Sequence, residues 1–272
     1  KIFYTTSSYE YYGRSASLIH TTPDGEADAP IHDGTRIYMF AGSQHGAGRF
    51  PPPSGRGTQN SANANDYRWG LRALLLALND WVAGKAEPPP SQYPRMSDHQ
   101  LVPLAEVRFP KIPSVEIPKR MHHGYRVDYG PDFLSKGIVT IEPPKVGKEF
   151  RMFVPQVNSD GNETSGIQLP VIQAPLASYM GWNLRAPEIG APKELYSMRG
   201  SYIAFPKTAA DSKKTGDPRA SIKERYGNRK TYLKKINEAS RKLAREGYIL
   251  SHDIPGITQQ AAKQWDYHMK KN

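Results

Sequence analysis

The chain has no cysteine among its 272 residues, which excludes disulfides and thiolate metal sites. It also lacks any apolar run near the ~20 residues that a helix needs to cross a bilayer, and no signal peptide pattern is visible. We therefore expect no membrane span and no cofactor. The absence of cysteine is compatible with a bacterial exported protein, so we expect a periplasmic or secreted location.

The composition is that of a loop-rich globular protein. Hydrophobic residues make up 38% of the chain, which also contains 24 prolines and 23 glycines. This level of proline and glycine falls short of what signals disorder. The length allows one large domain or two modest ones. The first residue, Lys1, opens directly into a strand pattern, so we expect processing, truncation or a missing upstream segment.

The net charge of +11 raises the question of nucleic acid. Much of the excess lies in the last 70 or so residues, where lysine and arginine alternate with acidic residues along a helical pattern. Such alternation is typical of a solvated helix face. Because no RNA- or DNA-binding motif accompanies the charge, we expect no nucleic-acid partner.

Two strand-like runs near the start each end in a candidate catalytic residue. The first, Ile2 to Tyr4, leads into a polar turn that carries Glu10. The second, Ile37 to Phe40, ends in a loop bracketed by glycines that presents His45. Catalytic residues are often held on short loops that rigid elements support. We therefore expect Glu10 and His45 to lie together at one edge of a sheet.

These two residues suit the acid and base of an acyl-transfer site. An imidazole titrates near neutral pH and can accept the proton of a nucleophile. A neighbouring carboxylate would orient it and stabilise its cationic form. Other interpretations remain open, because His45 could be an ordinary loop histidine and Glu10 a surface carboxylate. Three acids in the intervening loop compete for the role of Glu10: Asp24, Asp28 and Asp33.

The whole chain divides into three segments by composition. Residues 1–86 hold the two strands and a helix from Trp69 to Val82, with Asn65 and Asp66 as caps. Residues 87–200 are rich in proline and glycine, with β-type runs in 101–109, 125–130, 137–144, 150–157 and 166–172. Residues 201–272 are helical, with helices expected over 221–226, 230–246 and 257–269, and with Ser221 and Thr231 as candidate starts.

Three further groups could carry chemistry, each with a plainer interpretation. The segment from Asn158 to Glu163 offers oxygen ligands like a calcium loop, but a hairpin turn is favoured. His122 and His123 lack further ligands at metal spacing, so we expect no metal. An aromatic and polar group could line a substrate pocket, although core packing is favoured: Tyr179, Trp182 and Asn183.

Several strings resemble one family across nearly the whole chain. They are YTTSSYEYYGRSASLIHTTPDG, RIYMFAGSQHG, NDYRWGLRALLLAL, VPQVNSDGNETSGIQLP, ASYMGWNLR and GDPRASIKERYG. They look like the bacterial α/β-hydrolase domain proteins, which are often exported and are regarded as serine esterases. The resemblance implies an α/β fold in which Glu10 and His45 match the acid and base positions.

In such hydrolases the catalytic residues follow the order serine, acid, histidine, and the serine lies on a G-x-S-x-G turn. This sequence has no such turn. Ser7 and Ser8 are too close to Glu10 to occupy a separate strand, and Ser43, Ser54 and Ser201 lack the flanking pattern. We therefore expect the C-terminal part of an α/β-hydrolase sheet, followed by a β-rich segment and a helical C-terminus.

The resulting hypothesis is a serine carboxyl-ester hydrolase whose nucleophile lies on a missing upstream segment or a companion chain. This chain would supply the acid and base for a small-molecule ester, and the isolated chain would be inactive. The alternative is a non-catalytic binding or assembly subunit that retains a hydrolase-like scaffold.

Overall fold

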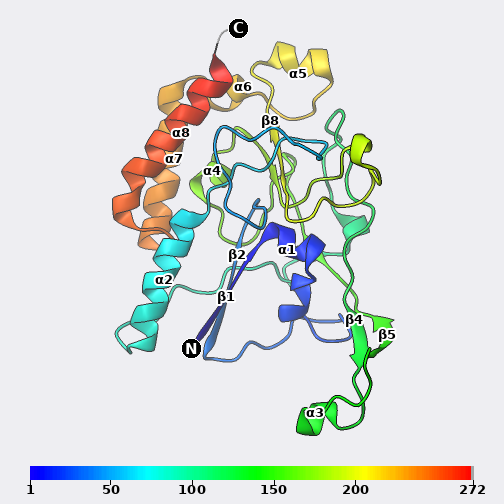
Figure 1. The fold of residues 1–272 in the computed structure, drawn as a ribbon. Helices are drawn as coiled ribbons and strands as arrows, with labels where there is room; N and C mark the ends of the chain where they lie inside the picture. The colour runs from blue at the N-terminus through cyan, green and yellow to red at the C-terminus, as the bar shows by residue number, and fades with distance from the viewer. Residues whose placement is uncertain (271–272) are drawn as a thin grey trace.

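A computed structural model describes residues 1–270 of the chain (Figure 1). At its centre lie two parallel strands, β1 (Ile2–Ser7) and β2 (Thr35–Phe40). Their register runs from Ile2 opposite Thr35 to Ser7 opposite Phe40. Parallel strands end at the same edge of a sheet, so the segments that follow β1 and β2 begin side by side. The two strands predicted from the sequence are confirmed.

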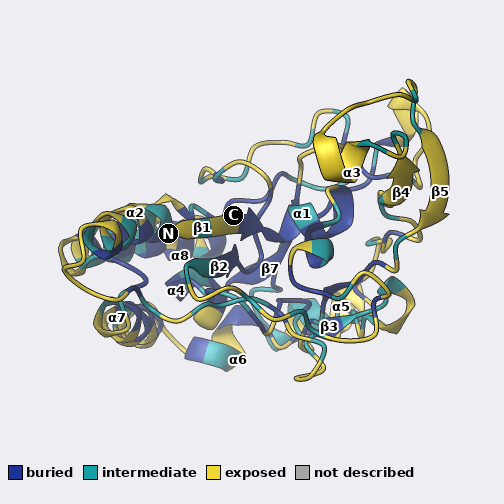
Figure 2. Ribbon diagram, turned by 90° about the horizontal axis from the view of Figure 1, so that it is seen from below, coloured by how far each residue is buried: buried dark blue, intermediate teal, exposed yellow. Residues whose placement is uncertain are grey.

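Within residues 1–270, the outer edge of β2 is paired and the outer edge of β1 is not. Met39 donates its backbone N–H to Gln92 at 2.8 Å, and Ile167 donates to the Met39 carbonyl at 2.7 Å. Among the described residues, β1 pairs only with β2. Ile2 and Tyr4 on β1 are 51% and 44% exposed, and Figure 2 shows the start of β1 as exposed ribbon.

One helix follows each of these two strands in the chain. The first, α1 (Ser8–Gly13), follows β1 directly and leads to the 3₁₀ turn η1 (Ala16–Ile19). The second, α2 (Arg68–Val82), confirms the helix predicted over 69–82. Its caps differ in part from the prediction. Asp66 accepts from the Arg68 N–H at 3.3 Å, whereas Asn65 is buried and donates to the Ala41 and Gly42 carbonyls.

Residues 87–200 contain strands, as predicted, but not at all of the predicted positions. Three antiparallel strand pairs form. Two of them lie wholly within this segment, and the third joins a strand of this segment to a strand that begins at Ser201. They join β3 (Leu101–Val102) to β6 (Val154–Pro155), β4 (Tyr125–Asp128) to β5 (Lys145–Glu149), and β7 (Ala177–Met180) to β8 (Ser201–Ala204). Short helical turns lie between them: η2 (Leu104–Glu106), α3 (Phe133–Lys136), α4 (Pro170–Gln173) and η3 (Pro187–Ile189).

Two predicted strands are wrong. Residues 137–144 are irregular and almost wholly exposed, so no buried face holds them in a sheet, and Pro143 and Pro144 have no N–H to donate. Residues 166–172 make a single bridge, through Ile167 to β2, and then enter α4. Pro170 favours that helix because it occupies a first-turn position, where its missing N–H is not needed. The β4–β5 pair and α3 project from the body of the protein (Figure 1).

The C-terminal segment is helical, as predicted. It contains α5 (Ala209–Thr215), α6 (Ile222–Tyr226), α7 (Arg229–Arg245), η4 (Ser251–Asp253) and α8 (Ile254–Met269). Ser221 caps α6, as expected, but Asn228 rather than Thr231 caps α7. Along one side of the molecule, α7 and α8 lie against each other near α2 (Figure 1).

The core has two parts that meet at β2. One packs the helical side against β2, through residues such as Phe40, Leu74 and Tyr232. The other packs β2 against β6, β7 and α1, through residues such as Met39 and Tyr179. Together they fix β2 on both faces. No helix among residues 1–270 is long and apolar enough to cross a membrane.

Candidate active site

Glu10 is the third residue of α1, where it helps to begin the helix. Its Oε2 accepts a hydrogen bond from the Ser7 backbone N–H at 2.7 Å, and the Ser7 hydroxyl donates to the same oxygen. This is one half of a capping box, in which an acid at the third position satisfies the helix start. The polar turn predicted at Glu10 is therefore a short helix. The cap uses Oε2 and leaves Oε1 available.

His45 lies in the loop that leaves the end of β2. The loop includes Gly42, whose φ of +59° is in the left-handed region that favours glycine. A Cβ there would lie 2.8 Å from Ile172 Cδ1, so a larger residue would also clash. Further along, the Tyr67 hydroxyl donates to the His45 carbonyl. The loop backbone is thus held on both sides of the imidazole.

The structure brings the two residues together. His45 Nδ1 lies 2.6 Å from Glu10 Oε1. The Glu10 side chain is 17% exposed and the His45 side chain 49% exposed. A carboxylate on Nδ1 holds the proton on that nitrogen, which leaves Nε2 as the acceptor. The arrangement can therefore accept a proton from a group that approaches the exposed imidazole.

Buried hydrogen bonds join α1 to the His45 loop. Tyr9 donates its N–H to the Ser43 carbonyl at 3.2 Å. Ser8 and Ser43 bond reciprocally, since the N–H of each donates to the hydroxyl oxygen of the other, at 3.3 and 3.1 Å. These contacts lie immediately beside Glu10 and His45, and they fix the distance between α1 and the His45 loop.

A third carboxylate joins the same network and was not anticipated as a site residue. Glu163 is buried, and its Oε2 accepts from the Gly42 N–H at 2.8 Å and from the Ser8 hydroxyl. Burial raises the pKa of Glu163 to about 7. The sequence places Glu163 only at the end of a polar turn. No local pattern connects it with residues more than a hundred positions away.

The competing acids of the loop lie elsewhere. Asp28 accepts from the Met96 and Ser97 N–H groups at 2.9 and 3.0 Å. Asp24 accepts from the Thr22 hydroxyl and the Glu26 N–H. None of the carboxylates of Asp24, Asp28 and Asp33 hydrogen-bonds to His45. The fold selects Glu10 as the partner of His45 in this structure.

The serines near the pair have other partners. Ser43 is buried and its hydroxyl donates to the Phe40 carbonyl at 2.5 Å. Ser8 is also buried, and Ser201 donates to the Trp182 carbonyl at 2.7 Å. Within residues 1–270, no hydroxyl hydrogen-bonds to His45 Nε2.

The other candidate groups are structural in this fold. His122 donates its N–H to the Tyr12 carbonyl, and His123 pairs with Glu149 at 3.2 Å. The oxygens of the 158–163 turn diverge, because Asp160 pairs with Arg225 while Glu163 turns inward. No group of three or more potential metal-binding side chains occurs in the part of the chain that the structure describes. Three residues considered for a pocket are buried in the core: Tyr179, Trp182 and Asn183.

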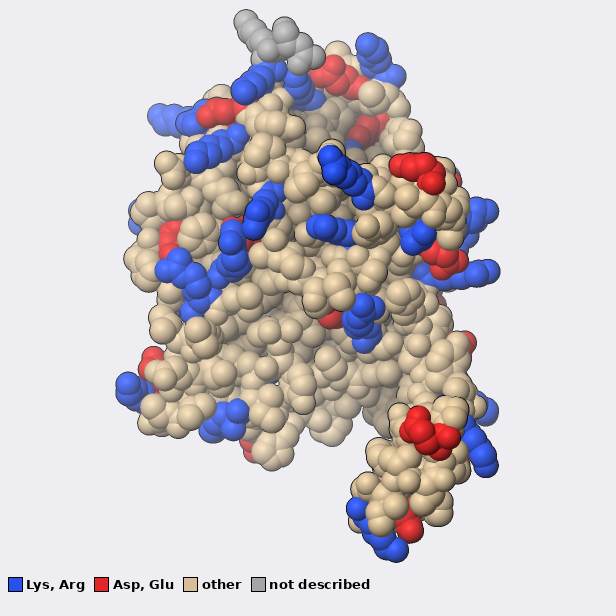
Figure 3. Space-filling view, in the orientation of Figure 1, with Lys and Arg blue, Asp and Glu red and all other residues tan. Residues whose placement is uncertain are grey.

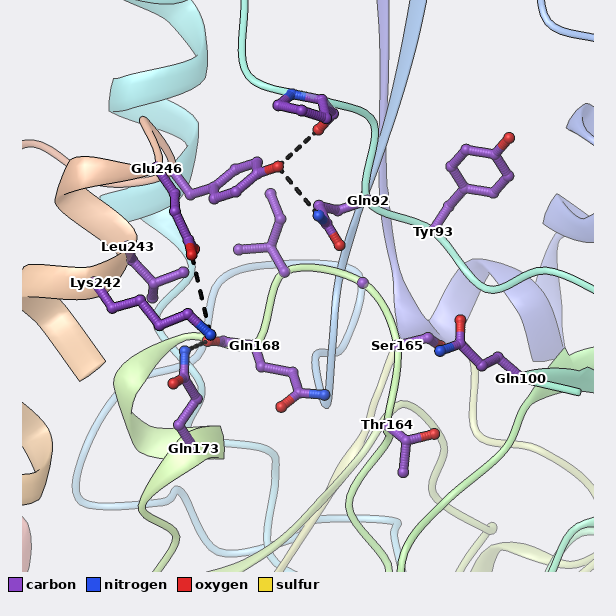
Figure 4. A pocket seen from close by; sticks show the side chains of 14 residues that line it. Gln92, Tyr93, Gln100, Thr164, Ser165, Gln168, Gln173, Lys242, Leu243 and Glu246 are labelled. Carbon is purple, nitrogen blue, oxygen red and sulfur yellow. Dashed lines mark hydrogen bonds and ion pairs between the residues drawn. The ribbon is translucent and has the colours of Figure 1, made fainter. Parts of the chain in front are cut away.

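A separate cavity of about 530 Å³ lies between α7 and the segments that flank β2 (Figure 4). Its lining includes amide side chains, among them Gln92, Gln100 and Gln168. On the α7 side of the cavity, Lys242 and Glu246 form an ion pair at 4.0 Å. Neither Glu10 nor His45 belongs to this lining, so the cavity is distinct from the acid–histidine pair.

An acid and a histidine at the carboxyl ends of neighbouring parallel strands are typical of the α/β hydrolases. Comparison of the sequence with family models agrees with this class. A model described as "Alpha/beta hydrolase domain" matches residues 1–259, and the chain belongs to this family of hydrolases. No curated protein and no solved structure matches the chain.

Proposed function

We propose that this chain supplies the acid and the base of a Ser-Glu-His triad in a serine carboxyl-ester hydrolase. The nucleophilic serine belongs to a polypeptide segment or companion chain outside these 272 residues. Its hydroxyl oxygen attacks the ester carbonyl while His45 takes the proton, and the imidazolium then protonates the departing alcohol. Water then attacks the acyl-serine while His45 takes its proton, and the imidazolium returns a proton to the departing serine oxygen. Backbone amides of the segment or chain that carries the serine hold the oxyanion.

The observation that carries this proposal is the contact between His45 Nδ1 and Glu10 Oε1 at 2.6 Å. It occupies the nitrogen that must carry the proton and leaves half of the imidazole side chain exposed. A histidine held in this way is prepared to act as a general base. Since no hydroxyl of residues 1–270 meets Nε2, the nucleophile is assigned to a partner segment.

Exposed apolar surface supports the presence of such a partner. Ile2 and Tyr4 on β1 are about half exposed, and on α2 the side chains of Leu75 and Leu76 are 69% and 52% exposed. The surface over β1 carries few charged side chains (Figure 3). An open strand edge beside apolar side chains is a site where another strand can add. The isolated chain is then inactive towards small esters.

The experiment uses the protein with every segment or chain that accompanies it. A fluorophosphonate probe should label one serine, and peptide mapping should place it outside residues 1–272. His45→Asn keeps a polar side chain but removes the base, and p-nitrophenyl ester turnover should fall by about 10³-fold or more. The matched control is His99→Asn, at an exposed position with a φ of 54° that asparagine tolerates.

Two results would overturn the proposal. One is a labelled serine within residues 1–272, because it would remove the need for an external nucleophile. The other is unlabelled protein whose ester turnover is unchanged by His45→Asn. That second outcome supports the alternative of a binding or assembly subunit. A periplasmic or secreted location stays a prediction, which fractionation of the producing bacterial cells would check.

A further inference from the structure

Glu163 reaches the acid–histidine pair from a distant part of the chain. It follows the turn that Asn158 closes, where the Asn158 N–H donates to the Asn162 carbonyl at 2.8 Å. Asn162 is tied to β7, because its Oδ1 accepts from the Tyr179 N–H at 2.8 Å and its amide donates to the Ala177 carbonyl. The carboxylate is therefore supported by a rigid strand rather than by a free loop.

One oxygen of Glu163 serves both halves of the site. Oε2 accepts from the N–H of Gly42 in the His45 loop, and from the hydroxyl of Ser8, the first residue of α1. Gly42 lies three residues before His45, and Ser8 lies two residues before Glu10. Since Glu163 is 3% exposed, water does not replace these contacts. A charged acceptor strengthens both hydrogen bonds.

From this geometry we infer that Glu163 is a positioning residue, which holds the Glu10 helix and the His45 loop at the separation that the 2.6 Å contact requires. This inference rests on the proposed function. Glu163 does not touch the reacting atoms. It acts through Ser8 and Gly42, and without it two buried donors lose their acceptor.

The ionisation of Glu163 offers a test that a merely structural role would not pass. Burial raises the pKa of Glu163 to about 7. The titratable groups that face it from α1 are the phenols of Tyr11 and Tyr12, whose pKa values burial raises above the usual range, so both stay neutral near pH 7. Below pH 7, Glu163 gains a proton and its carboxylate no longer accepts as an anion.

The experiment compares kcat against pH for the complete esterase assembly and for Glu163→Gln. As pH falls from 8 through 7, the wild type should lose a larger fraction of its kcat than Glu163→Gln, because only the wild type protonates Glu163 in that range. At pH 8 the variant should have a kcat about 10-fold lower with KM little changed, since the loss is of geometry and not of substrate contact. The matched control is Glu188→Gln, an exposed acid in η3.

Ser8→Ala provides a second variant, which removes the hydroxyl that donates to Glu163 and leaves the Gly42 N–H contact in place. If Glu163 acts through Ser8, the effects of Glu163→Gln and Ser8→Ala on kcat should not add in the double variant. The proton on His45 Nδ1, observed by NMR in the downfield imidazole region, should exchange faster with solvent in each variant than in the wild type. This readout does not depend on turnover.

The outcomes separate the two proposals. If His45→Asn abolishes turnover while Glu163→Gln and Ser8→Ala leave kcat, its pH profile and the Nδ1 proton as in the wild type, the role of Glu163 is overturned and the esterase proposal stands. If His45→Asn leaves turnover unchanged, the esterase proposal fails whatever the Glu163 variants do. A pH profile changed by Glu163→Gln, together with non-additive effects of Glu163→Gln and Ser8→Ala on kcat, supports both the esterase proposal and the positioning role of Glu163.

Discussion

At the scale of single residues, Glu10 divides its two oxygens between two tasks. Oε2 accepts from the Ser7 backbone at the start of α1, and Oε1 faces His45 Nδ1 at 2.6 Å. The helix cap therefore fixes the side chain before any substrate is bound. A carboxylate that is already held in this way loses little side-chain entropy when it orients the imidazole.

Glu10→Gln tests this division. The amide oxygen can keep the contact with the Ser7 N–H, which turns the amide NH₂ group towards His45 Nδ1. The imidazole must then accept on Nδ1 and carry its proton on Nε2, which is the wrong tautomer for a base. We expect kcat to fall by roughly 10³- to 10⁴-fold with the melting temperature little changed, as glutamine also suits a capping box. A fall in kcat of less than about tenfold would contradict the assigned role, and Glu188→Gln serves as the control.

At the scale of elements, adjacent residues of α2 differ sharply in burial. Leu74 is 2% exposed and packs in the core cluster with Phe40 and Tyr232, whereas Leu75 is 69% exposed. In a helix, neighbouring residues point about 100° apart, so one buried stripe leaves the next position facing outward. Leu76, the next residue, is also about half exposed, and these apolar side chains are consistent with a surface that another polypeptide segment covers.

The two neighbouring leucines provide a matched comparison. Leu74→Ala should lower the free energy of unfolding of this chain by about 2–5 kcal/mol, because it leaves a cavity in the core. Leu75→Gln should change it by less than about 0.5 kcal/mol. Urea denaturation followed by tryptophan fluorescence measures both. If a companion segment covers Leu75, the same Leu75→Gln substitution should weaken its association. Equal effects of the two variants on unfolding of this chain would contradict the assigned burial.

At the scale of the whole molecule, the positive charge is dispersed. Lys and Arg side chains are spread over the visible face and alternate with acidic ones (Figure 3). On the C-terminal helices, Arg229 pairs with Asp266 at 2.8 Å and Lys234 lies near Glu238. Exposed pairs of this kind contribute little to stability. The arrangement agrees with the solvated helix face expected from the sequence.

Buried titratable groups should make stability depend on pH. Burial lowers the pKa of His20 and of His268 from 6.5 to about 4. The unfolded chain therefore binds more protons between pH 6.5 and 4, and the stability contributed by the neutral histidines is lost as pH falls through this window. Glu163 acts in the opposite direction, because its pKa is raised from 4.5 to about 7. Its contribution is present below pH 4.5 and is lost as pH rises to 7.

These opposing effects give a prediction for two variants. Between pH 7 and pH 5, Glu163→Gln should make the fall in unfolding free energy steeper, because the opposing carboxylate is removed. His268→Gln should make that fall shallower, because one histidine no longer titrates. Urea denaturation at both pH values measures the slopes. Parallel curves for the wild type and both variants would show that these groups do not titrate with the assigned pKa values.

Local pattern alone determined a large part of this protein. Apolar runs predicted β1 and β2, helical spacing predicted α2 and most of the C-terminal helices, and the ends of the two strands pointed to Glu10 and His45. Each of these signals lies within a few consecutive residues, where periodicity and residue type act directly. Runs in 137–144 and 166–172 misled because a strand also needs a partner edge, which a sequence pattern does not supply.

Only the tertiary structure decided which groups meet. It selected Glu10 over three aspartates that are close in the sequence, because the capping box at Ser7 directs one oxygen of Glu10 towards His45. It also brought Glu163 across the chain to Ser8 and Gly42. A buried carboxylate owes its position to hydrogen-bond donors that are distant in sequence. Local periodicity does not predict such contacts, since they form only when distant segments of the chain pack together.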